Sequence, residues 1–245
     1  MTEVLSLLPG WSCSPTALQP LADCLRPALE VRLEALPLSA NPANWLDELD
    51  ERLPRGGWLG GWSLGGMLAA QLAARRGGDC PGLVTVASNA CFSSREDWPE
   101  AMPLATFEAF RESFQQDPAG TLKRFTVLCS RGGSAPRQSA QRLQALQHGW
   151  SPEALAAGLC LLAELDGRDA LRQYAGPQLH LFGADDALVP QGGAASLQAL
   201  LPQAQIEMIA AGHALPLETP ELLSERIRAF ILAATKRQRA LGVRP

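Results

Sequence analysis

The segment 61–65 has the spacing G-x-S-x-G and places Ser63 between two glycines. An apolar run at 58–62 leads into it, and a helical pattern begins at Leu64. A tight turn from strand to helix holds its central residue in strained backbone and needs small neighbours. Such a turn raises the serine hydroxyl above the sheet and directs free helix N–H groups toward it. The pattern therefore predicts that Ser63 is a nucleophile.

A nucleophilic serine needs a general base, and the chain has three histidines. His148 lies among helical patterns, and His180 lies inside an apolar strand, where a packed, hydrogen-bonded core residue is expected. His213 lies in a loop just after the last predicted strand. Because parallel sheets place their chemistry at the carboxyl ends of the strands, we predict His213 as the base.

The acid that orients such a histidine is expected between the serine and the histidine in chain order. Asp185 and Asp186 both follow the apolar strand that ends at Phe182. One carboxylate is expected to hold His213, and the other to be a solvated loop residue. The residues by themselves leave this choice open.

These groups predict ester hydrolysis. Ser63 attacks the ester carbonyl while His213 takes its proton, and water later releases the acid from the acyl-enzyme. The oxyanion needs preset donors, each worth about 3 kcal/mol. We expect them to be the backbone N–H groups of Leu64 and of Trp11, which lies in the loop after the first strand; the alternative for Trp11 is simple packing. No metal and no organic cofactor is required.

The elements that must position these residues alternate between strand and helix. Apolar runs predict strands at 4–8, 31–35, 58–62, 83–87, 178–182 and 206–209. Helical patterns lie between them, which is typical of an α/β fold with a mostly parallel sheet covered on both faces. Only helical patterns occupy 92–174. We therefore expect a sheet core from 1–91 and 175–245, and a helical cap at 92–174.

Composition limits the function classes. The 245 residues are 47% hydrophobic, and the net charge is −4 at pH 7, which does not favour nucleic acid. The six cysteines have no zinc spacing, and the first residues show no signal-peptide pattern. No run of apolar residues is long enough for a membrane span. We expect a cytoplasmic monomer that binds neither nucleic acid nor membrane.

The predicted cap has two unusual features. It carries five phenylalanines, which either pack the cap onto the core or form an apolar acyl channel: Phe92, Phe107, Phe110, Phe114 and Phe125. From 118 to 152 it lacks Asp and Glu but holds Lys123, Arg124, Arg131, Arg137 and Arg142. This basic stretch is either a solvated face or a docking site for an acidic protein or a phosphate.

Several stretches resemble the pimeloyl-[acyl-carrier protein] methyl ester esterase (BioH) family of the α/β-hydrolase superfamily. They lie at 58–66, 83–93, 96–99, 165–169 and 188–190. The resemblance implies hydrolysis of the methyl ester of pimeloyl-[acyl-carrier protein] in biotin biosynthesis, with methanol as the leaving group. It also implies acyl carrier protein as the partner. The family's His-Gly-Trp is Pro9-Gly10-Trp11 here, and we expect fewer strands before it in this sequence than the family usually has.

The resemblance also assigns residues. The family acid lies two positions before Leu-Val-Pro, which selects Asp186. The family's substrate contacts match Trp11, Ser63, Leu64, Phe125, Cys129 and His213. Its carrier-docking arginines match Arg124 and Arg137, with a third at Arg142, while a fourth position is Gly120 here.

Two other functions stay open at this point. One is a broad-specificity carboxylesterase for short acyl esters that uses the same residues. The other is a non-catalytic binding protein on a hydrolase scaffold. The Ser, Asp, His order argues against the second, since a receptor has no need for all three groups.

Overall fold

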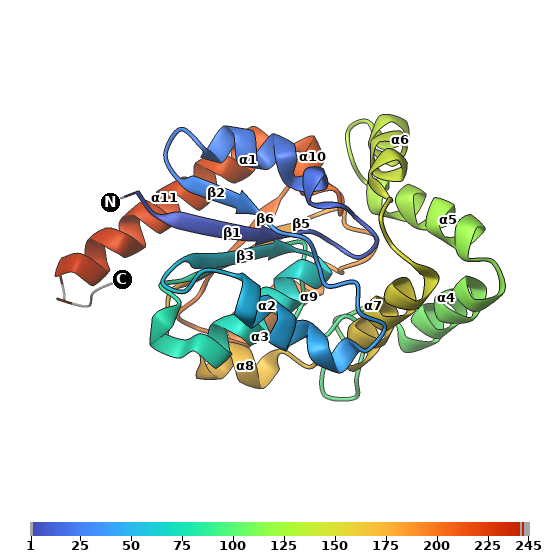
Figure 1. The fold of residues 1–245 in the computed structure, drawn as a ribbon, viewed down its shortest axis with the longest axis horizontal. Coiled ribbons are helices and arrows are strands. Elements are labelled where there is room, and N and C mark those ends of the chain that lie inside the picture. Colours follow the sequence, from blue (N-terminus) through green and yellow to red (C-terminus); the bar gives the residue numbers. More distant parts are fainter. Residues whose placement is uncertain (1, 241, 243–245) are drawn as a thin grey trace.

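A single parallel sheet forms the centre of the computed structural model, which describes residues 2–240 and 242. Its order is β2-β1-β3-β4-β5-β6, and all neighbouring strands pair in parallel (Figure 1). The strands are β1 (Val4–Leu8), β2 (Glu30–Leu33), β3 (Trp58–Trp62), β4 (Leu83–Val86), β5 (Gln178–Gly183) and β6 (Gln205–Ile209). Residue 1 and residues 241 and 243–245 of the predicted core lie outside the described residues.

Helices cover both faces of this sheet, which confirms the predicted α/β architecture (Figure 1). One face carries α1 (Gln19–Leu25) and α11 (Pro220–Ala240), with the short α10 (Leu215–Glu218) beside them. The other face carries α2 (Trp45–Arg52), α3 (Leu64–Arg76), α8 (Arg168–Gln173) and α9 (Gly192–Leu200). None of these helices, nor any other in the described part of the chain, is long and apolar enough to cross a membrane.

The central strands are apolar without interruption because both of their faces are covered. Every residue of β3, β4 and β5 is buried. The edge strand β2 instead alternates, with Val31 buried between exposed Glu30 and Arg32. It spans 30–33 rather than the predicted 31–35, because only four of its residues find partners on β1.

The segment between β4 and β5 contains helices and no strand among its described residues, as the sequence predicts. Four of them lie beyond the carboxyl ends of the strands (Figure 1). These are α4 (Leu104–Gln116), α5 (Pro118–Ser130), α6 (Pro136–Leu146) and α7 (Pro152–Glu164). Three of the four begin with proline, whose missing N–H costs nothing at that position.

The fifth helix of the segment, α8, packs against α3 on the sheet, close to Asp166, whose backbone carbonyl accepts a hydrogen bond from Gln71 Nε2 at 3.0 Å. It therefore lies with the sheet rather than above it. The division at 92 and 174 stays a prediction.

His180 is buried inside β5, with 1% of the residue exposed. Its Nδ1 lies 2.7 Å from Thr85 Oγ1 on β4, and its Nε2 lies 3.3 Å from Gln178 Oε1. It is thus the hydrogen-bonded core residue that the sequence predicts. Burial lowers the pKa of His180 to about 3, because the charged imidazolium loses its hydration there.

This shift makes stability depend on pH. The folded protein keeps His180 neutral down to about pH 3, whereas the unfolded chain takes up a proton below about pH 6.5. The stability contribution is therefore complete above pH 6.5 and falls as the pH drops toward 3. At pH 5 the loss is about 2 kcal/mol. Between pH 7 and pH 5 the free energy of unfolding should fall by about 2 kcal/mol less in the variant His180→Gln than in the native chain. Urea unfolding at the two pH values measures this difference. Equal losses in both proteins would contradict this expectation.

Candidate active site

Ser63 lies at the turn between β3 and α3 with φ 56° and ψ −123°, a conformation that L-residues rarely adopt. The turn is held from both sides. The Ser63 N–H donates to the Val86 carbonyl at 2.9 Å, and the Ser63 carbonyl accepts from Gly66 N–H at 2.9 Å. The serine is therefore fixed at the carboxyl end of the sheet, at the positive end of a 13-residue helix.

The glycines on either side of Ser63 are required by packing. A Cβ at Gly61 would overlap the backbone of Gly65, one turn ahead. A Cβ at Gly65 would overlap the carbonyl oxygens of Leu8 and Pro9 at the end of β1. The G-x-S-x-G spacing thus lets α3 approach both its own strand and the loop after β1.

Asp186 and His213 meet through a hydrogen bond of 2.8 Å between Oδ2 and Nδ1. Both side chains are almost completely buried, at 0% and 1% exposure. The second oxygen, Oδ1, accepts the backbone N–H groups of Leu188 at 2.8 Å and Val189 at 2.9 Å. Asp185, by contrast, is exposed. The structure therefore brings Asp186, rather than Asp185, to His213.

Trp62 connects the turn that carries Ser63 to the loop after β6 that carries His213. Its indole Nε1 donates to the His213 backbone carbonyl at 2.8 Å. The centroids of the indole and imidazole rings lie 5.7 Å apart. Within residues 2–240, Ser63 Oγ makes no hydrogen bond to His213. Catalytic hydrogen bonds of this type often tighten only when substrate binds. Nothing local in the sequence distinguishes this indole from one that only packs, so Trp62 is not among the predicted site residues.

The loop after β1 lies directly beside the serine. A Cβ built on Gly10 would be 3.4 Å from Ser63 Cβ. In the described chain, no carbonyl accepts a hydrogen bond from the backbone N–H of Trp11 or of Leu64. Both N–H groups therefore lack a backbone acceptor, and their role as oxyanion donors stays a prediction.

The Trp11 side chain points away from the sheet into the cap. Its Nε1 donates to the Leu155 carbonyl of α7 at 2.9 Å. Its ring meets Phe110, Phe114 and Phe125 edge-on, at centroid distances of 5.8, 5.8 and 4.9 Å. Trp11 thus combines a backbone position beside Ser63 with a side chain that joins the cap.

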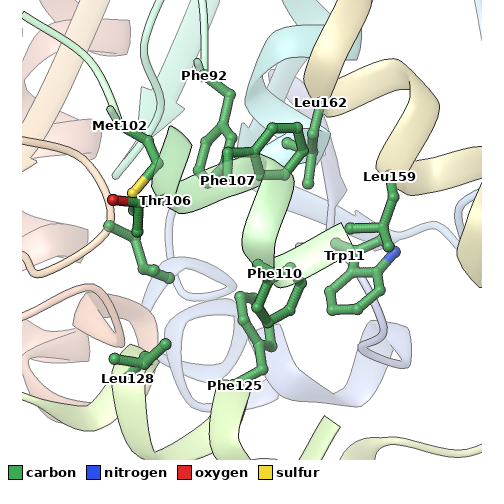
Figure 2. A pocket seen from close by; sticks show the side chains of 11 residues that line it. Trp11, Phe92, Met102, Thr106, Phe107, Phe110, Phe125, Leu128, Leu159 and Leu162 are labelled. Carbon is green, nitrogen blue, oxygen red and sulfur yellow. The ribbon is translucent and has the colours of Figure 1, made fainter. Parts of the chain in front are cut away.

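An apolar pocket opens beside this tryptophan (Figure 2). Side chains from α4, α5 and α7 surround it, together with Trp11 and Leu188, whose N–H holds Asp186. Its volume is about 50 Å³, whereas small-molecule sites usually measure about 300–1,000 Å³. The lining has no charged residue: Trp11, Phe92, Met102, Thr106, Phe107, Phe110, Phe125, Leu128, Leu159, Leu162 and Leu188. Ser63, Asp186 and His213 do not line this pocket, and the acyl channel stays a prediction.

The two other predicted substrate contacts on α5 differ in position. Phe125 lines the pocket, whereas Cys129 does not. Cys129 is 2% exposed, and burial raises its pKa well above the usual value, with Cys13 and Asp186 adding to the effect. Cys129 is therefore a neutral thiol close to the Asp186 carboxylate.

The three predicted docking arginines are exposed on α5 and α6. Arg124 donates to Thr121 Oγ1 at 2.7 Å and lies 3.7 Å from the Asp117 carboxylate. Arg137 and Arg142 make no ion pair within residues 2–240. At Gly120, where the family has a fourth contact, the N–H donates to the Asp117 carboxylate that caps α5, at 2.9 Å.

The described residues contain no group of three or more His, Cys, Asp or Glu side chains that could hold a metal ion. The chemistry that these residues can perform is nucleophilic attack with a histidine base. His148 is exposed in the loop after α6.

Comparison with known proteins agrees with this geometry. Residues 39–220 match the family model described as alpha/beta hydrolase fold. The chain is 38% identical over 242 residues to the biotin biosynthesis bifunctional protein BioHC of Cellvibrio japonicus, covering 93% of this chain and 47% of that one. It thus spans about half the length of that relative.

Other relatives match over nearly their whole length. The pimeloyl-[acyl-carrier protein] methyl ester esterase of Aromatoleum aromaticum is 36% identical over 233 residues, covering 89% of this chain and 93% of that one. Among solved structures, an esterase from Exiguobacterium antarcticum has a TM-score of 0.81 at 18% identity and covers 94% of this chain and 91% of that chain. The chain therefore belongs to the alpha/beta hydrolase fold family and, within it, to the pimeloyl-[acyl-carrier protein] methyl ester esterase family.

Proposed function

We propose that this chain hydrolyses the methyl ester of pimeloyl-[acyl-carrier protein], releasing pimeloyl-[acyl-carrier protein] and methanol. The buried Asp186–His213 hydrogen bond, at the same edge of the sheet as the strained Ser63 turn, carries the proposal. The relatives named for this reaction support the choice of ester. The family relationship supports a place in biotin biosynthesis.

The reaction proceeds in two steps. Ser63 Oγ attacks the ester carbonyl carbon while His213 accepts its proton, and the tetrahedral intermediate collapses as His213 protonates the departing methoxide. Water then attacks the acyl-enzyme with the same histidine as base. Asp186 keeps the Nδ1 proton in place and stabilises the imidazolium that forms in each step.

Two backbone N–H groups meet the charge that develops on the carbonyl oxygen. Leu64 N–H belongs to the first turn of α3, so the helix dipole adds to its effect. Trp11 N–H comes from the loop that packs beside Ser63. Donors of this type are held by the fold before substrate arrives, so they need no reorganisation during the reaction.

The cap supports recognition of both parts of the substrate. The uncharged lining of the apolar pocket suits the methylene chain of the pimeloyl group, and the pocket has to widen to hold it. Arg124, Arg137 and Arg142 lie exposed on α5 and α6, where they can meet an acidic protein and the phosphate of its prosthetic group. The six free cysteines support a reducing compartment, and we propose a cytoplasmic monomer.

The direct test measures methanol release from purified pimeloyl-[acyl-carrier protein] methyl ester. It is paired with complementation of a biotin auxotroph that lacks its own esterase, using Ser63→Ala as the control. Turnover of the carrier-linked ester well above that of short p-nitrophenyl esters supports the proposal. The reverse preference favours the broad short-acyl carboxylesterase.

The two neighbouring aspartates provide a matched pair for the acid. We expect Asp186→Asn to lower kcat by about 10³–10⁴-fold, because the amide holds His213 in the wrong tautomer. Asp185→Asn should change kcat less than about twofold, since Asp185 is exposed and does not contact His213. Initial rates with p-nitrophenyl butyrate measure both. Similar losses in the two variants would refute this assignment.

Charge reversal tests the docking surface. We expect Arg124→Glu and Arg137→Glu each to raise KM for the carrier-linked ester by about tenfold, because opposite charges are replaced by like charges. Hydrolysis of p-nitrophenyl butyrate should not change. Arg237→Glu, on the exposed side of α11 far from the cap, is the control. A KM that is unaffected in the cap variants would show that the carrier protein binds elsewhere.

A further inference from the structure

Cap helix α6 and the turn 131–133 that precedes it contact the catalytic edge of the sheet. Ser139 and Leu143 in the middle of α6 are buried, and the helix packs along α5. The turn 131–133 and the carboxyl end of α6 contact three different loops that carry the proposed catalytic groups. This arrangement differs from a helix that only covers a pocket, and no α6 residue lines the apolar pocket.

The turn 131–133 packs on the loop after β5, which carries Asp186. Gly132 has φ 84°, and a Cβ there would overlap the Asp185 carbonyl oxygen and lie 2.8 Å from Asp185 Cβ. The backbone of this turn therefore lies in van der Waals contact with the residue before Asp186. A side chain at position 132 has no space unless the loop after β5 moves.

The same turn packs on the loop after β6, which carries His213. A Cβ at Gly212 would overlap the Arg131 carbonyl oxygen and lie 3.1 Å from Gly133 N. Gly212 directly precedes His213. One turn of the cap thus fixes the neighbours of both members of the Asp186–His213 pair.

The carboxyl end of α6 holds the loop after β1, which carries the proposed oxyanion N–H of Trp11. The Leu146 carbonyl accepts the Ser14 N–H at 3.0 Å, and Gln147 Nε2 donates to Ser12 Oγ at 3.0 Å. Ser12 has φ 64°, which is strained for a serine and persists only when its surroundings hold it. Ser12 directly follows Trp11, so Gln147 restrains the loop that carries the proposed oxyanion N–H.

We propose that α6 and the turns at its two ends, through Gln147 and Gly132, form a positioning element that holds the loops carrying Trp11, Asp186 and His213 in place relative to Ser63. The inference rests on the proposed serine esterase mechanism and adds its positioning residues. Because Arg137 and Arg142 lie on the same helix, a carrier protein bound there contacts the element that aligns the catalytic groups. Loss of these contacts acts on kcat rather than on KM.

The test measures how fast a fluorophosphonate labels Ser63, together with kcat and KM for p-nitrophenyl butyrate. We expect Gln147→Ala to lower both the labelling rate and kcat by about tenfold, within the range for small misplacements of catalytic groups. KM and the melting temperature should stay unchanged. Gln144→Ala, an exposed glutamine on the same helix, is the matched control.

A double-mutant cycle identifies the route of the effect. If Gln147 acts through Ser12, Gln147→Ala should cost little further activity in a Ser12→Ala background. Additive losses, or a Gln147→Ala rate equal to that of Gln144→Ala, would overturn the proposal at this end of α6.

Two glycines with the same backbone conformation test the other end. Gly149 has φ 83° and open space around its Cβ position, whereas Gly132 has φ 84° and no space. Gly132→Ala should lower kcat and the labelling rate at least tenfold more than Gly149→Ala. Equal effects of the two substitutions would overturn the role of this turn. If Gly132→Ala does not fold, the double-mutant cycle of Gln147 and Ser12 still tests the proposal at the other end of α6.

The probes separate this inference from the proposed function. A native chain that labels at Ser63 and hydrolyses the butyrate, but not the carrier-linked ester, refutes the proposed substrate and leaves the α6 measurements valid. A native chain that reacts with no probe refutes both.

Discussion

The buried hydrogen bond between Asp186 and His213 is the interaction on which the site depends. A carboxylate without exposure to water is costly unless its oxygens are satisfied. Asp186 meets this condition with two backbone N–H groups and the imidazole Nδ1, three donors in all. The arrangement is possible because β5 and β6 pair in parallel, with Gly183 opposite Ile209. Both loops therefore leave the sheet side by side.

The same parallel geometry brings the other groups to this edge. β1 and β3 end next to each other, with Leu8 opposite Gly61, so the loop carrying Trp11 lies against the turn carrying Ser63. Trp62 then ties β3 to the histidine loop through its indole N–H. Four strand ends thus meet, and each contributes one part of the proposed machinery.

The sequence predicted the parts that depend on local pattern. Strand β3 and the start of α3 have the expected bounds, because apolar runs and glycine spacing are local signals. The choice between Asp185 and Asp186 could not be made locally, since both residues have the same chemistry and differ only in the direction of their side chains. The Trp62–His213 and Gln147–Ser12 contacts join residues 151 and 135 positions apart. No short pattern encodes such contacts, because the first forms only when the sheet assembles and the second only when the cap folds over it.

The contacts of the cap with the rest of the chain differ in kind from one helix to the next. Helix α6 is held by hydrogen bonds to Ser12 and Ser14, and α7 is held by the Trp11 indole. In contrast, the described residues 105–116 of α4 make no side-chain hydrogen bond to the sheet; their polar contacts stay within the helix, as between Arg111 and Glu108. Helix α4 contributes Phe107 and Phe110 to the pocket through apolar packing alone. Helix α4 thus contacts Trp11 through apolar packing, whereas α6 and α7 hold the loop after β1 through hydrogen bonds, so the two kinds of contact are divided among the helices of the cap.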